Sequence, residues 1–260
     1  MAKLELTDGT ELHWHEHGAG PGALVCGIGY GSPEAFQGLI DDLSKDHRVV
    51  VPDLRGTGES SRHGPYDIET DVSDLAAVLE RGGAVGVAIG LGDGCHRAIE
   101  LGAARPDLLG SVIMSGYAPL SRGELRAGLS GSGQVLEALV KLLETDYRAG
   151  LRTIIETGNP GLDEGAIRER LDKAVAHCSH EAATARLRSW IRLDVRDAAR
   201  ALGDRLWVLH HERNPWFPEE LADGVSDLLP EARIEKVDDG ALSRPDLTAA
   251  VVRRITGAAG

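Results

Sequence analysis

The stretch VAIGLGDGCHRAIEL, residues 87–101, gives the strongest indication of the fold. Its first residues form a short apolar run that predicts a buried strand, and its last residues space apolar side chains as a helix does. A glycine-rich turn at residues 90–94 joins the two, an arrangement typical of parallel sheets covered by helices. The residue at the apex of this turn is Gly92, and glycine offers no side chain that could react with a substrate.

The rest of the chain repeats this alternation of apolar strands and amphipathic helices. The dipeptide Asp8-Gly9, which lies between two alternating runs, predicts an N-terminal hairpin. Because the later strands are apolar throughout, the sequence predicts a mostly parallel sheet with helices on both faces. The further strands are expected near residues 23–28, 47–54, 84–90, 108–116, 204–211 and 232–239, and the helices near residues 33–46, 67–82, 95–106, 217–230 and 244–257.

Residues 119–199 break the alternation, because they contain helical patterns only. A helical insertion between two strands of a parallel sheet usually covers the carboxyl ends of the strands, where ligands bind. We therefore expect residues 1–118 and 200–260 to form the core domain and residues 119–199 to form a helical cap or lid. Trp190 belongs to an apolar stripe of this insertion and is a candidate pocket residue.

The composition limits the kinds of partner. The chain has 260 residues, 42% of them hydrophobic, and a formal net charge of −13. This charge argues against nucleic acid and anionic membranes as partners. The three cysteines are too few for a disulfide framework or a zinc site, and no apolar run predicts a signal peptide or a membrane span. The expectation is a cytoplasmic monomer or homodimer that binds an apolar small molecule without a metal or cofactor.

A second segment, PDLRGTGES at residues 52–60, matches the pattern D-x-R-G-x-G-x-S. With this segment and residues 87–101, the chain resembles the α/β-hydrolase-fold superfamily along essentially its whole length, and the resemblance implies that fold. Asp53 and Arg55 are expected to hold their loop by charge-assisted hydrogen bonds, and the glycines between them and Ser60 to permit its backbone angles. We interpret this segment as scaffold.

The resemblance implies a nucleophile at the turn, an acid after a late strand and a histidine after the last strand. The corresponding positions here hold Gly92, Asn214 and Ala241. All ten histidines lie at or before position 211, so no histidine can follow the last strand. A shifted alignment that makes Asp93 the nucleophile would place bulkier residues, Leu91 and Cys95, where the turn requires small ones. The sequence therefore predicts that the chain is not a serine hydrolase.

Two backbone N–H groups of the resembled site do not depend on side chains. The resemblance implies that Ile28 and Asp93 would donate them to an oxyanion. The Asp93 side chain has two interpretations: a general acid or base that faces the pocket, or a cap of the helix that follows.

Other candidate residues lie near the expected pocket. Strand alternation sends His210 and His211 to opposite faces, so at most one of them is expected to reach the pocket as a catalytic base. Cys26, Tyr30 and Leu91 complete the candidate pocket residues, together with Trp190.

Three functions remain open after the sequence analysis. The first is a non-hydrolytic enzyme that catalyses a cofactor-free cyclisation, isomerisation or elimination, a chemistry associated with specialised metabolism. The second is a catalytically inactive protein that binds a ligand or a partner. The third is a hydrolase with relocated groups, in which Cys26 or Cys95 would be the nucleophile and His210 or His211 the base.

Overall fold

The computed structural model describes residues 1–115, 133–159, 161–211 and 219–257, and the candidate Asn214 lies outside them. The described strands form one eight-stranded sheet in the order β1-β2-β4-β3-β5-β6-β7-β8. β1 and β2 form the predicted hairpin, and β2 pairs antiparallel with β4, whereas the remaining pairs are parallel. The strands are β1 Ala2–Glu5, β2 Glu11–His17, β3 Gly22–Cys26, β4 Arg48–Asp53, β5 Val85–Leu91, β6 Leu109–Ser115, β7 Leu206–His210 and β8 Arg233–Lys236.

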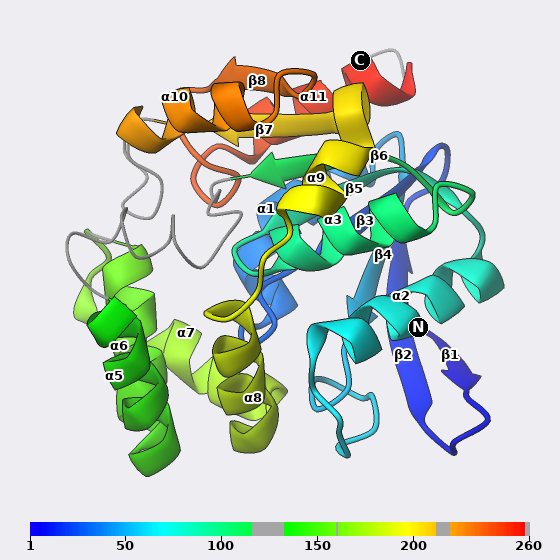
Figure 1. Cartoon of the computed structure of the whole chain (residues 1–260). Helices are drawn as coiled ribbons and strands as arrows, with labels where there is room; N and C mark the ends of the chain where they lie inside the picture. The colour runs from blue at the N-terminus through cyan, green and yellow to red at the C-terminus, as the bar shows by residue number, and fades with distance from the viewer. Residues whose placement is uncertain (116–132, 160, 212–218, 258–260) are drawn as a thin grey trace.

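Helices cover both faces of this sheet, as predicted (Figure 1). α1 and α11 pack on one face, and α2, α3 and α9 pack on the other. The described helices of the core are η1 Pro33–Phe36, α1 Gln37–Leu43, α2 Ile68–Gly82, α3 Gly94–Ala104, α9 Arg196–Leu202, η2 Gly203–Arg205, α10 Glu219–Leu228 and α11 Pro245–Thr256. No described helix is long and apolar enough to cross a membrane.

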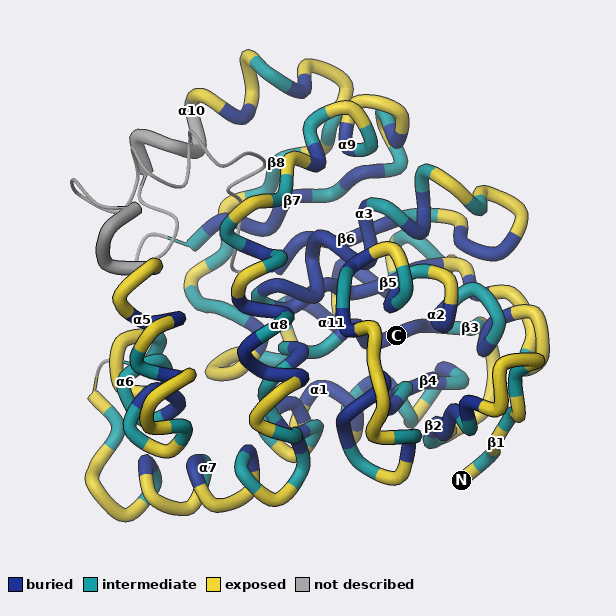
Figure 2. The backbone as a smooth tube through the Cα atoms, turned by 60° about the horizontal axis from the view of Figure 1, so that its bottom comes forward, coloured by how far each residue is buried: buried dark blue, intermediate teal, exposed yellow. Residues whose placement is uncertain are grey.

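The alternation of side chains along each strand explains why both faces are covered. In β5, Ala88 contributes to the apolar cluster beneath α2 and α3, whereas Val87 and Ile89 contribute to the cluster beneath α1 and α11. All three side chains are fully buried, and the central strands are buried along most of their length (Figure 2). A strand of this kind has no polar face, which is why its sequence is apolar throughout.

Within residues 119–199, which were expected to form a cap, four described helices lie beside the carboxyl ends of the strands (Figure 1). The junction of α7 and α8 is tied to the core, since Gly58 N–H donates to His177 O and Ser179 N–H donates to Gly56 O. α9 begins inside the predicted cap range but packs against α3, so the core resumes a few residues earlier than expected. The cap helices are α5 Gly133–Thr145, α6 Tyr147–Gly158, α7 Glu164–His177 and α8 His180–Trp190.

The loop after β4 has the scaffold role predicted for it. The Asp53 carboxylate accepts a hydrogen bond from Glu59 N–H at 3.0 Å. Arg55 donates to both carboxylate oxygens of Asp74, at 2.7 and 2.9 Å, so the guanidinium fork is matched in the bidentate geometry that makes such pairs strong. Gly56 and Gly58 have φ values of 76° and 48°. The loop is therefore held by the Asp53 carboxylate from within and by the pair of Arg55 with α2.

Candidate active site

The turn between β5 and α3 keeps the geometry of a nucleophile elbow without a nucleophile. Gly92 has a φ of 58°, in the left-handed region that glycine tolerates at no steric cost. A Cβ added at Gly90 would lie 2.5 Å from Cys95 Cα, and one at Gly94 would lie 2.0 Å from Cys26 O. The two crowded positions flank Gly92 symmetrically, so the shifted alignment with Asp93 at the apex is wrong.

Ile28 occupies the space into which a nucleophile at position 92 would point. A Cβ added at Gly92 would lie 2.9 Å from Cγ1 of Ile28, closer than such atoms approach in proteins. The side chain of Ile28 therefore packs over the apex of the turn. The space that a reactive side chain at position 92 would need is therefore occupied by the apolar side chain of Ile28.

A Gly92→Ser variant is expected to be less stable than the wild-type protein by about 1–3 kcal/mol, because a non-glycine residue with this backbone conformation is strained. Ile28 must also move to admit the new Cβ. Chemical unfolding monitored by circular dichroism measures the difference. Gly86→Ser, in the strand β5 that precedes the turn, is the control, since a Cβ there has only ordinary contacts, the nearest at 3.5 Å. Equal stability of both variants would contradict this description of the turn.

The two backbone donors of the predicted oxyanion hole are available. Ile28 and Asp93 both line a cavity of about 560 Å³ between the cap helices and the ends of the strands. Among the described residues, neither of their N–H groups donates a hydrogen bond, whereas the neighbouring Gly29 N–H donates to the Asp93 carboxylate at 3.0 Å. Donors held in place before a substrate binds are the basis of oxyanion stabilisation.

The Asp93 side chain does not cap α3. Asp93 has helical angles, φ −65° and ψ −15°, and its carboxylate accepts no hydrogen bond from a backbone N–H of the first turn of the helix. One carboxylate oxygen accepts the Gly29 N–H, and the other accepts Arg97 Nη2 at 2.9 Å. Because both oxygens are occupied by donors and the residue is only 3% exposed, Asp93 is a positioning residue for the oxyanion loop. The geometry gives its acid–base interpretation little support.

Asp93 belongs to a buried ion-pair network that joins the core to the cap. Arg186 of α8 donates to both oxygens of Asp71, at 2.9 and 2.8 Å, and to Gly29 O at 3.3 Å. Arg97 lies 3.5 Å from Asp71 and donates to Asp93. The network therefore fixes the oxyanion loop from both sides, through one arginine of the core and one of the cap.

A cavity of about 560 Å³ lies between the cap and the ends of the strands. Its volume is within the range of sites for small organic molecules. Tyr30, Leu91 and Trp190 line it, as expected from the sequence. Burial raises the pKa of the Tyr30 phenol, so this group stays neutral. Further apolar lining residues are Ala35, Phe36, Leu139, Leu151, Ile154, Ile155, Leu162, Ala174 and Leu187.

The cavity also receives a histidine and a carboxylate from two neighbouring strand ends. His211 follows β7, Asp239 follows β8, and both line the cavity. Their Nδ1 and Oδ1 atoms are 3.9 Å apart. Gly240 N–H donates to Asp239 Oδ1 at 2.8 Å, and a Cβ added at Gly240 would lie 2.9 Å from His211 Nε2. The imidazole therefore packs against the loop that precedes Ala241.

This arrangement transposes the histidine and the acid of the resembled family. The histidine is at the end of the strand where the family has its acid, and the acid is in the loop where the family has its histidine. The sequence analysis named His211 but missed Asp239, although the pair of aspartates in VDDGALS after the last strand was a signal. It also missed Ser115, whose buried hydroxyl lines the cavity 3.4 Å from Thr248 Oγ1.

Neither His210 nor Ala241 supplies a catalytic group to the cavity. His210 points to the opposite face of β7 and is fully buried, which contradicts a role as a base that meets substrate. The position of Asn214 lies outside the described residues. Ala241 lines the cavity and, as a small apolar residue, cannot replace the histidine of a triad.

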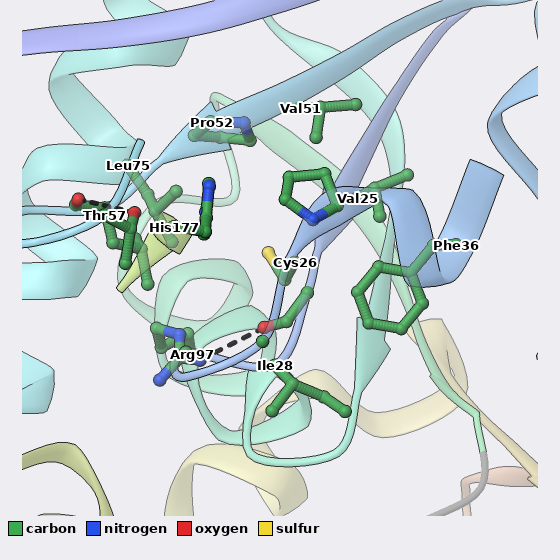
Figure 3. Close-up of a pocket in the computed structure, with 15 residues that line it drawn as sticks. Val25, Cys26, Ile28, Phe36, Val51, Pro52, Thr57, Leu75, Arg97 and His177 are labelled. Atoms are coloured by element: carbon green, nitrogen blue, oxygen red, sulfur yellow. Dashed lines mark hydrogen bonds between the residues drawn. The ribbon is translucent and has the colours of Figure 1, made fainter. Parts of the chain in front are cut away.

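The cysteines have the properties of inert core residues. Cys26 lines a separate cavity of about 30 Å³ behind the oxyanion loop, where Arg97 donates to Gly27 O at 3.1 Å (Figure 3). Burial raises the pKa of the Cys26 thiol to about 12 and raises that of Cys95 as well. Because the thiolate is the reactive form, neither residue is a suitable nucleophile. The placement of Cys26 in the substrate pocket was wrong.

The fold and the elbow define the class of protein. The model of the alpha/beta hydrolase family matches residues 17–251, and the chain belongs to this family. A curated relative, named "Putative carbamate hydrolase RutD", from Azorhizobium caulinodans, is 27% identical over 236 residues, which are 89% of this chain and 88% of that protein.

Solved structures confirm the fold. A bromoperoxidase from Bacillus anthracis has a TM-score of 0.81 at 17% identity, with 95% of this chain and 96% of that chain covered. The enol-lactonase from Burkholderia xenovorans has a TM-score of 0.79 at 18% identity, with 98% of this chain and 100% of that chain covered. At these identities the likeness concerns the fold alone.

Proposed function

We propose that this chain is an enzyme that acts on a small carbonyl compound by general-base catalysis, without a covalent intermediate. The observation that carries the proposal is that His211, Asp239 and both oxyanion donors line one cavity, whose elbow has no nucleophile. A base and an oxyanion hole are the two groups that proton abstraction next to a carbonyl requires. The reaction class is therefore a cofactor-free isomerisation, elimination or cyclisation.

Each group has a defined part in such a step. Nδ1 of His211 lies 3.9 Å from Asp239 Oδ1, and in the proposed step the imidazole takes a proton from the carbon next to the carbonyl. The electron pair of the broken C–H bond moves to the carbonyl oxygen, and the Ile28 and Asp93 N–H groups stabilise the enolate. The Asp239 carboxylate stabilises the imidazolium. Return of the proton to another atom, or loss of a leaving group, completes the reaction.

A second candidate is hydrolysis by a water molecule that His211 activates. The names of the relatives favour it, because a carbamate hydrolase and an enol-lactonase are among them. The same base and the same oxyanion hole would serve, with water as the attacking group. An inactive ligand-binding protein is the third possibility, and the open cavity is consistent with it too.

One experiment separates these possibilities. The protein is incubated in deuterium oxide with 2-tetralone and ethyl acetoacetate, and deuterium at the α-carbons is followed by NMR. The p-nitrophenyl esters of acetate and butyrate are tested in parallel. Exchange above the buffer rate supports the proposal, whereas ester hydrolysis without exchange would favour activated water. Binding of the ketones with neither reaction would overturn the proposal and indicate a ligand-binding protein.

A further inference from the structure

The cap contributes a positive charge to the wall of the cavity. Arg170, in the middle of α7, lines the cavity together with Ala174, one turn later on the same helix. The side chain of Arg170 is half-buried. In a chain with a net charge of −13, a cation that faces an otherwise mostly apolar cavity is a feature that requires explanation.

The guanidinium of Arg170 is oriented by a neutral partner. Its Nη1 donates to Asn159 Oδ1 at 2.7 Å, and Asn159 Nδ2 in turn donates to Ile155 O at 2.9 Å. Within the described part of the chain, Arg170 makes no ion pair with a carboxylate, whereas the adjacent Glu169 pairs with Lys173 at 2.7 Å. Asn159 therefore holds the guanidinium of Arg170 in position, and no carboxylate of the described residues forms an ion pair with it.

The other charged residues that line the cavity differ from Arg170, because each has a partner of complementary charge or a histidine beside it. Asp93 is paired with Arg97, and Asp239 lies beside His211. Lys173, a second cation that lines the cavity, is paired with Glu169. Because Nε and Nη2 of Arg170 are not used by Asn159, they form the fork that matches a carboxylate in a bidentate arrangement. Asn159 contributes the orientation, and the apolar walls contribute contacts for a hydrocarbon skeleton.

We infer that Arg170, positioned by Asn159, forms a carboxylate-binding subsite, so that the ligand of the cavity is a small apolar monocarboxylate. The inference rests on the proposed function only for the chemistry that follows binding, because the subsite itself requires no catalysis. The negative charge of the whole protein repels anions, and a local cation is what allows one class of anion to enter. For the proposed reaction, the substrate is then a keto acid or another carbonyl compound with a separate carboxylate.

The test compares two probes that differ in charge and little else. Isothermal titration measures the binding of 4-phenylbutyrate and of its neutral amide, 4-phenylbutyramide. The wild-type protein is expected to bind the carboxylate at least about tenfold more tightly, which corresponds to about 1.4 kcal/mol. In Arg170→Gln this preference disappears, and in Arg170→Lys it is reduced, because lysine keeps the charge but loses the fork.

Arg168→Gln is the matched control, because Arg168 lies on the same helix, is 70% exposed and is not among the cavity residues. Its preference for the carboxylate should equal that of the wild type. An unchanged preference in Arg170→Gln, or equal binding of both probes by the wild type, would overturn the inference. Titration of His211→Gln with the same two probes separates the two claims, because this variant should keep the preference for the carboxylate. If it does, and the wild type catalyses no deuterium exchange, only the proposed function is refuted.

Discussion

An Asp71→Asn variant is expected to have a free energy of unfolding about 3–5 kcal/mol below that of the wild-type protein. Asp71 is 1% exposed and accepts both hydrogen bonds of the Arg186 fork, with Arg97 at 3.5 Å. Without its charge, two buried guanidinium groups would share the single carboxylate of Asp93. Removal of one partner from a buried pair leaves an uncompensated charge, which costs more than the pair contributes.

Asp107→Asn provides a control with the same substitution and a similar geometry. Asp107 pairs with both arms of Arg105, at 2.9 and 2.7 Å, but its side chain is 60% exposed. A pair in solvent contributes at most about 1 kcal/mol. Urea unfolding of both variants measures the difference. A loss in Asp71→Asn no greater than that in Asp107→Asn would show that the network does not hold the cap and the oxyanion loop together.

The fold was predictable because its signals are local. The central strands of the parallel sheet are mostly apolar, and each core helix spaces its apolar residues on one face. The turn around Gly92 was predictable from its glycines, although only the close approach that requires Gly90, to Cys95, is local; the one that requires Gly94 is to Cys26 O, in another strand. The sequence could not show that α9 packs against α3, because its helical pattern is the same whether it packs on the cap or on the core.

The Asp93 contacts could not be predicted in this way. A carboxylate before a helix usually caps it, and that local preference was overridden by Arg97 and by Gly29, which lies 64 positions away in the sequence. The contribution of Arg186 depends on how the cap sits on the core, which no local pattern encodes.

The partner of His211 was missed for a related reason. The sequence was compared with the order of groups in the resembled family, in which a histidine follows the last strand. Asp239 became visible only when the ends of β7 and β8 were placed side by side, in the register that pairs His210 with Lys236. In this pair the histidine stands at the family's acid position and the acid at the family's histidine position. A comparison position by position therefore finds neither residue.

The largest effect on activity is expected for His211→Gln. Glutamine is similar in size to histidine and can still form hydrogen bonds, but it cannot take a proton. If His211 is the base, turnover falls by about 10²–10⁴-fold, the usual contribution of a positioned general base. Asp239→Asn should have a smaller effect in the same direction, because Asp239 acts through the imidazole. His63→Gln is the control and should leave turnover unchanged, because His63 is an exposed residue of the core domain.

The most direct test of the account is the rate of α-deuterium exchange into 2-tetralone, catalysed by the wild type and by His211→Gln at equal concentrations of folded protein. Circular dichroism establishes that both are folded. The account predicts that the wild type exchanges deuterium above the buffer rate and that the variant loses about 10²–10⁴-fold of this rate. A folded His211→Gln protein with the wild-type rate would contradict the assignment of the base in this cavity to His211.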